Sequence, residues 1–230
     1  MLRQLMFIFT LFLPILSLHA QDPEVLIKNI REKLDKINDY QAEAGLKTNI
    51  PFLQVPDADV EVFYKKPDKI KIKNEKGISL VPKESVSISL YSLVNGKYQV
   101  IDAGSDLLNG TPVRVLKLLP ANENADLVLA TLYIDAAKTL VLKAKITTRE
   151  NGTDEVDLSY GKYIQASLPD KIVFSFNTQD YKLPKGVTFD YDDGASKKNE
   201  TGNQKNQRGK IELSFHTYRI NRGLEDSIFK

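Results

Sequence analysis

The side chains that most often carry out catalysis or bind metals are scarce in this chain. Its 230 residues include no Cys and two His, His19 and His216. Without Cys there is no thiolate nucleophile, disulfide, Cys-ligated zinc or iron–sulfur cluster. The sequence also lacks a Gly-x-Ser-x-Gly elbow, a glycine-rich phosphate loop and a His-Glu-x-x-His pair. We therefore expect no catalytic residues, no metal site and no cofactor, and a hydrolase is disfavoured.

One acidic cluster resembles a calcium-binding loop at first sight. Asp190, Asp192 and Asp193 are followed directly by Gly194. Counted from Asp190, this Gly falls at position five, whereas the sharp turn of an EF-hand loop requires Gly at position six. We therefore interpret the four residues as turn formers and not as calcium ligands.

The basic residues do not indicate a nucleic-acid partner. The sequence has 32 Lys+Arg and 30 Asp+Glu, and the positive charges are spread along the chain, whereas a nucleic-acid binder usually gathers them on one face. The closest group, Lys65, Lys66 and Lys69, allows two interpretations. It could meet anionic lipid head groups, or it could be the solvated tip of a hairpin, which we favour.

The first twenty residues have the pattern of a secretory signal peptide. Arg3 precedes an almost wholly apolar run, LMFIFTLFLPILSL, and Ala20 supplies a small residue at the exit. The run is shorter than the about 20 residues that span a bilayer, and Pro14 would interrupt a helix. An uncleaved membrane anchor is the alternative. We expect residues 1–20 to be removed and residues 21–230 to form one soluble periplasmic domain, consistent with the lack of Cys.

An amphipathic helix is expected directly after the signal peptide. Asp22, Pro23 and Glu24 are typical of a helix start, because they suit the cap, the first turn and the positive end of the dipole. The pattern predicts that the helix ends within residues 40–44. It could close a sheet or plug the mouth of an open barrel, and the sequence does not separate the two. The apolar face consists of Leu26, Ile27, Ile30, Leu34 and Ile37.

From residue 45 onward the apolar residues recur every second position, which is typical of strands. Val62 and Tyr64 belong to a strand at 60–65, which we expect to form a hairpin with residues 70–73 through a Lys-Pro-Asp-Lys turn. A strand at 86–90 and the Asn95-Gly96 turn predict a second hairpin. A third has its turn at Asn151-Gly152. Further strands are predicted at 98–101, 113–119, 127–134, 140–149, 155–163, 171–177, 188–191 and 210–218.

These elements predict an α+β, mostly β, fold. About ten strands joined by short turns, with one long helix, indicate an antiparallel sheet that curls to remove its edges. Two segments stand apart as loops. Residues 102–112 (DAGSDLLNGTP) carry an apolar pair, Leu107 and Leu108, and residues 192–209 have nothing large to bury, which predicts a mobile loop.

The order of these elements resembles the outer-membrane lipoprotein carrier (LolA/LolB-like) family. The N-terminal helix, the segment ADVEVFYKKPDKIKIKN and the later LATLYIDAAKTLVLKAKITTRENGTDEVDLSYGKY carry the resemblance, which extends over about residues 22–229. The family implies an antiparallel half-barrel covered by helices, here including the N-terminal helix. It also implies an apolar cavity that holds lipoprotein acyl chains between an inner-membrane donor and an outer-membrane acceptor protein.

The resemblance and the apolar pattern together suggest which residues line the cavity or form its lid. Typical carriers have Arg before the hairpin Pro, where it helps tie the lid to the barrel. This sequence has Lys66 there, so we expect a weaker or absent latch, because Lys lacks the planar fork of Arg. No second family helix is visible in the sequence. The expected cavity or lid residues are Leu34, Ile37, Val62, Tyr64, Lys66, Leu107 and Leu108.

Two functions follow. The first is a monomeric periplasmic carrier of lipoprotein or lipid acyl chains, which requires a large apolar cavity that its own side chains do not fill. The alternative is a periplasmic interaction or sensory module of the same fold, with a closed core and no lipid cargo. Deleting residues 192–209 should separate them, because a carrier would keep its lipid and an interaction module would lose its partner.

Overall fold

The computed structural model describes residues 22–50, 56–74, 90–122, 124–178 and 208–229. The expected signal peptide, the strand expected at 188–191 and the acidic cluster at 190–194 lie outside these ranges. So do residues 86–89 of the strand expected at 86–90 and most of the loop expected at 192–209.

The N-terminal helix α1 (Pro23–Leu34) forms as the sequence predicts but ends earlier. The carboxylate of Asp22 accepts a hydrogen bond from the backbone N–H of Glu24 at 2.9 Å, and Leu26, Ile27 and Ile30 are buried. Residues 40–44, expected at the helix end, belong to strand β1 (Asp39–Asn49). Here Ala42, Ala44 and Leu46 are buried at every second position, and pairing with strands on both sides overrides the helix propensity of Ala.

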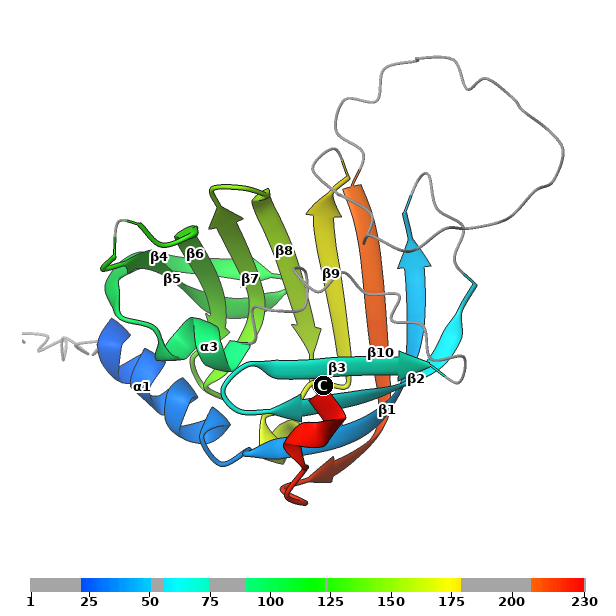
Figure 1. The fold of residues 1–230 in the computed structure, drawn as a ribbon. Coiled ribbons are helices and arrows are strands. Elements are labelled where there is room, and N and C mark those ends of the chain that lie inside the picture. Colours follow the sequence, from blue (N-terminus) through cyan, green and yellow to red (C-terminus); the bar gives the residue numbers. More distant parts are fainter. Residues whose placement is uncertain (1–21, 51–55, 75–89, 123, 179–207, 230) are drawn as a thin grey trace, which may run out of the picture.

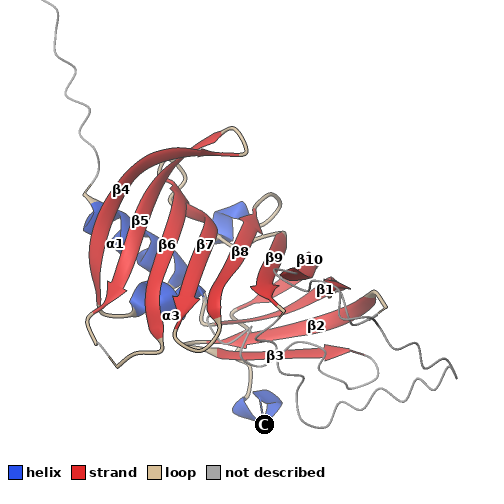
Figure 2. Ribbon diagram, turned by 90° about the horizontal axis from the view of Figure 1, so that it is seen from above, coloured by secondary structure: helices blue, strands red, loops and turns tan. Residues whose placement is uncertain are grey.

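Ten strands form one sheet in which every neighbouring pair is antiparallel, confirming the mostly β half-barrel with an N-terminal helix (Figures 1 and 2). The order is β3-β2-β1-β10-β9-β8-β7-β6-β5-β4, so β3 and β4 are the two edges. Figure 1 shows the sheet curling, with the helices α1 and α3 on its concave side. The other strands are β2 (Ala58–Lys65), β3 (Lys69–Asn74), β4 (Tyr98–Leu108), β5 (Thr111–Pro120), β6 (Leu127–Asp135), β7 (Leu140–Thr148), β8 (Gly152–Ser159), β9 (Lys171–Asn177) and β10 (Arg208–Ile220).

The segment after residue 89 is a helix, α3 (Leu90–Asn95), so the hairpin expected around Asn95-Gly96 is wrong. Leu93 and Val94 are buried against α1, and the guanidinium of Arg31 donates to the carbonyl of Val94 from Nη2 at 2.8 Å. The helix is favoured because it packs against α1 and because Arg31 bonds a carbonyl of its last turn, which has no partner within the helix. The sequence pattern did not predict this helix. The described residues also include two short 3₁₀ helices, η1 (Ile164–Ala166) and η2 (Asp226–Phe229).

Residues 102–112 form the last part of β4, the hairpin turn and the first two residues of β5, so the loop expected there is wrong. Asn109 and Gly110 both have positive φ, 49° and 81°, as a tight hairpin turn of the I′ type requires. The register shifts between Asp102 and Ser105, where Gly104 has a φ of 87°. The glycines of this segment therefore form a bulge and a turn within two paired strands.

Most of the buried apolar residues form two clusters on the concave side of the sheet. One cluster packs α1 and α3 onto β5, β6, β7 and the end of β8. The other joins β1, β2, β3, β9 and β10. Among the described residues, no helix is long and apolar enough to cross a membrane.

Candidate functional site

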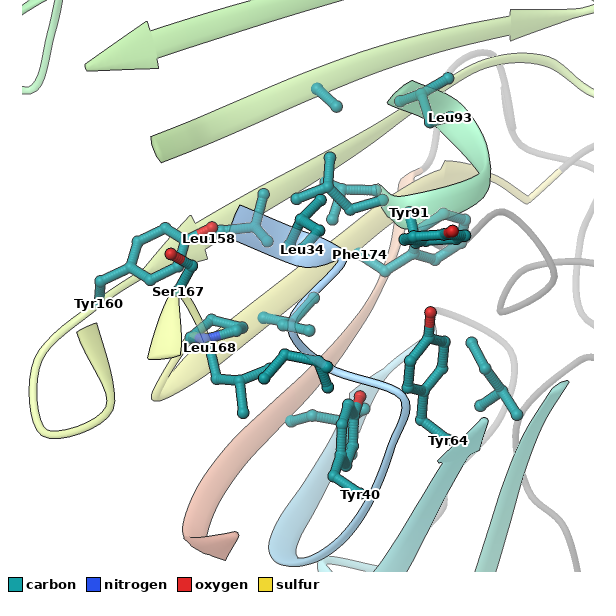
Figure 3. A pocket seen from close by; sticks show the side chains of 18 of the residues that line it. Leu34, Tyr40, Tyr64, Tyr91, Leu93, Leu158, Tyr160, Ser167, Leu168 and Phe174 are labelled. Atoms are coloured by element: carbon teal, nitrogen blue, oxygen red, sulfur yellow. The ribbon is translucent and has the colours of Figure 1, made fainter. Parts of the chain in front are cut away.

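A cavity of about 190 Å³ lies inside the curled sheet, with its lining drawn from both core clusters and the residues beside them (Figure 3). Side chains from α1 and the turn after it, from α3, from seven strands of the sheet and from the segment after β8 contribute to the lining. No charged side chain of the described residues is among them; their polar side-chain groups are the hydroxyls of four Tyr and of Ser167. Such a lining suits hydrocarbon and excludes a bare ion.

Two rows of neighbouring side chains on β8, β9 and β10 form one wall. In the first row Val156 pairs with Phe174, and Phe174 pairs with Ile211. In the second row, two residues away along each strand, the members are Leu158, Ile172 and Leu213. Residues two apart face the same side of a sheet, so both rows point into the cavity.

Tyr40 on β1 and Tyr64 on β2 form part of the opposite side of the cavity. They are directly opposite in the strand register, and their rings stack with centroids 5.1 Å apart. Burial raises the pKa of both phenols well above the ordinary value for Tyr, because the protein interior disfavours a phenolate. Both side chains therefore stay neutral.

A polar cluster ties the two helices to the β2–β3 turn beside the cavity. The ammonium of Lys66 donates to the backbone carbonyl of Asp35 at 2.8 Å and lies 3.5 Å from its carboxylate. The hydroxyl of Tyr91 on α3 donates to the same carboxylate at 2.9 Å. Lys66 also sits 5.3 Å from the centre of the Tyr91 ring. We call Asp35, Lys66 and Tyr91 the rim cluster.

The comparisons with known proteins find solved structures of similar fold but no match by sequence. No family model and no curated protein sequence matches the chain. A LolA superfamily protein from Nitrosomonas europaea superimposes with a TM-score of 0.54 and 14% identity, over 89% of this chain and 97% of that one. This chain has the LolA-like fold. The resemblance that the sequence analysis found is thereby confirmed at the level of the fold.

Two further solved structures share the LolA-like fold. One is a domain assigned to outer membrane lipoprotein sorting from Vibrio parahaemolyticus, with a TM-score of 0.53 and 14% identity over 90% of this chain and 96% of that one. The other is a DUF1329 family protein from Desulfovibrio piger, with a TM-score of 0.55 and 11% identity over 91% of this chain and 98% of that one. At these identities the similarity concerns the fold alone.

Three of the seven residues expected at the site line the cavity of the LolA-like fold. They are Leu34, Ile37 and Tyr64. Val62 lies next to them in the core cluster of β1, β2 and β3. Lys66 belongs to the rim cluster, and so makes the contacts that were expected to be weak or absent.

Leu107 and Leu108 lie outside the cavity lining, at the end of β4. The side chain of Leu107 is 68% exposed. Their expected role in a lid came from reading residues 102–112 as a loop, and the β4–β5 hairpin leaves them on an edge strand. The binding role of the other predicted residues stays a prediction.

Most of the lining was missed by sequence reasoning, although part of it left a signal. Ile172 and Phe174 lie two residues apart in a predicted strand, and so do Ile211 and Leu213. The two-residue period of a strand could therefore have predicted that each pair faces the cavity. Tyr40 was missed because the sequence pattern predicts the end of a helix at this position. Ser167 and Leu168 follow η1, and no local pattern indicates that this segment lines the cavity.

Proposed function

We propose that the protein is a binding protein, not an enzyme, which takes up acyl chains of lipoproteins or lipids and carries them through the periplasm toward the outer membrane. The observation that supports this proposal is the uncharged cavity inside the curled sheet. Each methylene that moves from water into such a space contributes about 0.8 kcal/mol, so even part of an acyl chain would be held firmly.

The helices on the concave side are well placed to act as a cover. Leu34 from α1 and three residues of α3, Leu90, Tyr91 and Leu93, line the cavity, so moving these helices would expose it. The rim cluster holds α1 and α3 against the β2–β3 turn through exposed or half-buried polar contacts. Contacts of this kind are weak enough to open and close during loading and release.

The cellular setting is part of the same proposal. Residues 1–20 would direct export, and residues 21–230 would act as a soluble monomer in the periplasm. An inner-membrane protein would donate the cargo, and an outer-membrane protein would accept it. The Vibrio parahaemolyticus domain with the same fold is assigned to lipoprotein sorting, which supports this direction of transport.

The alternative is an interaction or sensory module of the same fold. That role would need no internal space, and a closed core would be its natural form. The cavity therefore weighs in favour of the carrier.

Lipid analysis of the exported protein tests the proposal. The chain is produced with residues 1–20 in place, purified from periplasm without detergent and extracted with organic solvent. Mass spectrometry should detect acyl lipid or lipoprotein in the extract, and the delipidated protein should bind a fluorescent fatty acid. If the extract holds no acyl compound and the probe does not bind, the carrier proposal is wrong.

A further inference from the structure

Four tyrosine side chains line the cavity, and their hydroxyl groups fall into two classes. The hydroxyl of Tyr160 donates to the backbone carbonyl of Val141 at 3.0 Å, and that of Tyr91 donates to Asp35 in the rim cluster. The hydroxyls of Tyr40 and Tyr64 have no hydrogen-bond partner among the described residues. The cavity therefore contains two donors that the described part of the chain leaves unused.

These two hydroxyls face open space and are not sealed in the protein. Figure 3 shows Tyr40 and Tyr64 rising side by side, with their oxygen atoms directed into the cavity. Among the described residues, the one fully occluded side-chain polar atom without a partner is Oδ1 of Asp170, so neither phenol oxygen is fully occluded. Both are accessible to whatever occupies the cavity.

The chemistry around the pair favours a neutral acceptor. Burial keeps both phenols protonated, since the pKa of each lies well above the ordinary value for Tyr. No charged side chain of the described residues lines the cavity to neutralise an anionic head group. The nearby ammonium of Lys66 already contacts Asp35. A carboxylate would therefore lose its hydration without gaining a cation, whereas an ester carbonyl needs donors alone.

We propose that Tyr40 and Tyr64 donate hydrogen bonds to the carbonyl oxygen of an ester-linked acyl group, so that the cavity selects acyl esters over free fatty acids. This inference rests on the proposed function, because it assumes that the cavity holds the hydrocarbon of the same ligand. It adds the class of cargo and the residues that recognise it. The rows on β8, β9 and β10 contact the hydrocarbon of the acyl group, and the tyrosine pair binds its carbonyl.

Three probes with the same chain length separate recognition of the carbonyl from burial of hydrocarbon. Monopalmitoylglycerol carries an ester, hexadecylglycerol replaces the ester by an ether and so lacks the carbonyl, and palmitate carries a carboxylate. Each competes with a bound fluorescent acyl ester on the delipidated chain that lacks residues 1–20. We expect the ester to bind about tenfold more tightly than the ether, and the ionised palmitate to bind most weakly.

The variants Tyr40→Phe and Tyr64→Phe, singly and together, remove the hydroxyls and keep the rings. Each should weaken ester binding about fivefold and leave ether binding unchanged. Tyr160→Phe is the matched control, because it removes a cavity-lining hydroxyl that is already bonded to Val141. It should leave the ratio of ester to ether affinity unchanged. Circular dichroism checks that every variant is folded.

The outcomes distinguish this inference from the proposed function. If the fluorescent acyl ester does not bind and none of the three probes binds, the proposed function fails and the inference fails with it. If the probes bind but the double variant keeps the ester-to-ether ratio of the wild type, the inference alone is overturned. It is also overturned if palmitate binds the wild type as tightly as the ester.

Discussion

Val156 occupies a position where one side chain determines how much of the cavity stays open. It pairs with Ala144 on β7 and with Phe174 on β9, and all three residues line the cavity. A larger side chain here would extend from the wall into the empty space. Overpacking usually costs about 1–3 kcal/mol in a filled core, and less is expected where a cavity can accept the new atoms.

We therefore predict that Val156→Phe blocks acyl binding without unfolding the protein. The ring would displace about two methylenes of the chain, each worth about 0.8 kcal/mol, so affinity for a fluorescent fatty acid should fall about tenfold. Val128→Phe is the control, because Val128 is 43% exposed and lies outside the cavity lining. Equal losses in the two variants, measured by fluorescence titration, would contradict the assignment of the cavity as the binding site.

At the scale of the elements, Glu155 links three strands of the sheet. Its carboxylate accepts from the ammonium of Lys143 on β7 at 2.6 Å and from the guanidinium of Arg208 on β10 at 2.9 Å. These hydrogen bonds, that of Lys143 first, lower the pKa of Glu155 to about 2. The side chain is 19% exposed, so solvent screens the group only in part.

The depressed pKa of Glu155 predicts how stability depends on pH. The stabilisation is fully present above the ordinary pKa of Glu and is lost as the pH falls from about 5 through about 2. Glu155→Gln should lower the free energy of unfolding by about 1–3 kcal/mol at neutral pH, and by much less near the lower end of that window. Urea denaturation at several pH values measures this. Glu43→Gln, which alters an exposed pair with Arg219 at 3.8 Å, should change little at any pH.

The rim cluster predicts that the release rate of a ligand depends on Lys66. Lys66→Met removes the contact between the β2–β3 turn and Asp35, which loosens the helices over the cavity. An ion pair of this kind contributes about 0.2–1 kcal/mol, so release of a bound fluorescent fatty acid should be about twofold to fivefold faster. Stopped-flow displacement measures the rate.

Lys69→Met is the matched control for Lys66→Met. Lys69 lies at the same hairpin but contacts Asp226 of the C-terminal helix η2, at 3.0 Å. It should leave the release rate unchanged. Similar rates for the two variants would show that the rim cluster does not hold the cover.

The elements that could be predicted from the sequence are those fixed by local patterns. The hairpin of β2 and β3 and the Asn151-Gly152 turn between β7 and β8 combine a clear two-residue period with turn residues. The helix α3 forms from a short apolar run that fits the period of a helix as well as that of a strand. Its burial against α1 makes this run helical. The hairpin of β4 and β5 was missed because Gly104 and Gly110 serve a bulge and a turn inside it.

The site could be predicted less well than the fold, because it depends on pairing between distant segments. Tyr40 faces the cavity because β1 pairs with β2 on one side and with β10 on the other, where Tyr40 lies opposite Ile220. No local pattern near residue 40 carries that information. Leu34 and Ile37 were predicted from the apolar face of a helix, which shows within a few residues, although α1 ends at Leu34 and Ile37 lines the cavity from the turn after it.

At the scale of the whole molecule, the cavity lies where the two core clusters fail to fill the space inside one continuous sheet. The cluster of α1, α3 and β5–β8 and the cluster of β1–β3, β9 and β10 both contribute to its lining. An acyl chain in the cavity would contact both clusters at once. Ligand binding should therefore stabilise both ends of the sheet and not one end alone.

Hydrogen exchange on the delipidated protein tests this coupling. Monopalmitoylglycerol at a hundred times its Kd should raise the free energy of opening by about 2.7 kcal/mol for amides that exchange through global unfolding, in β1 and β10 as well as in β6 and β7. The cavity-filled variant Val156→Phe should show a much smaller response, since it binds the ligand weakly. Protection confined to one cluster would mean that the ligand lies on a surface of that cluster, and the shared cavity would not be its site.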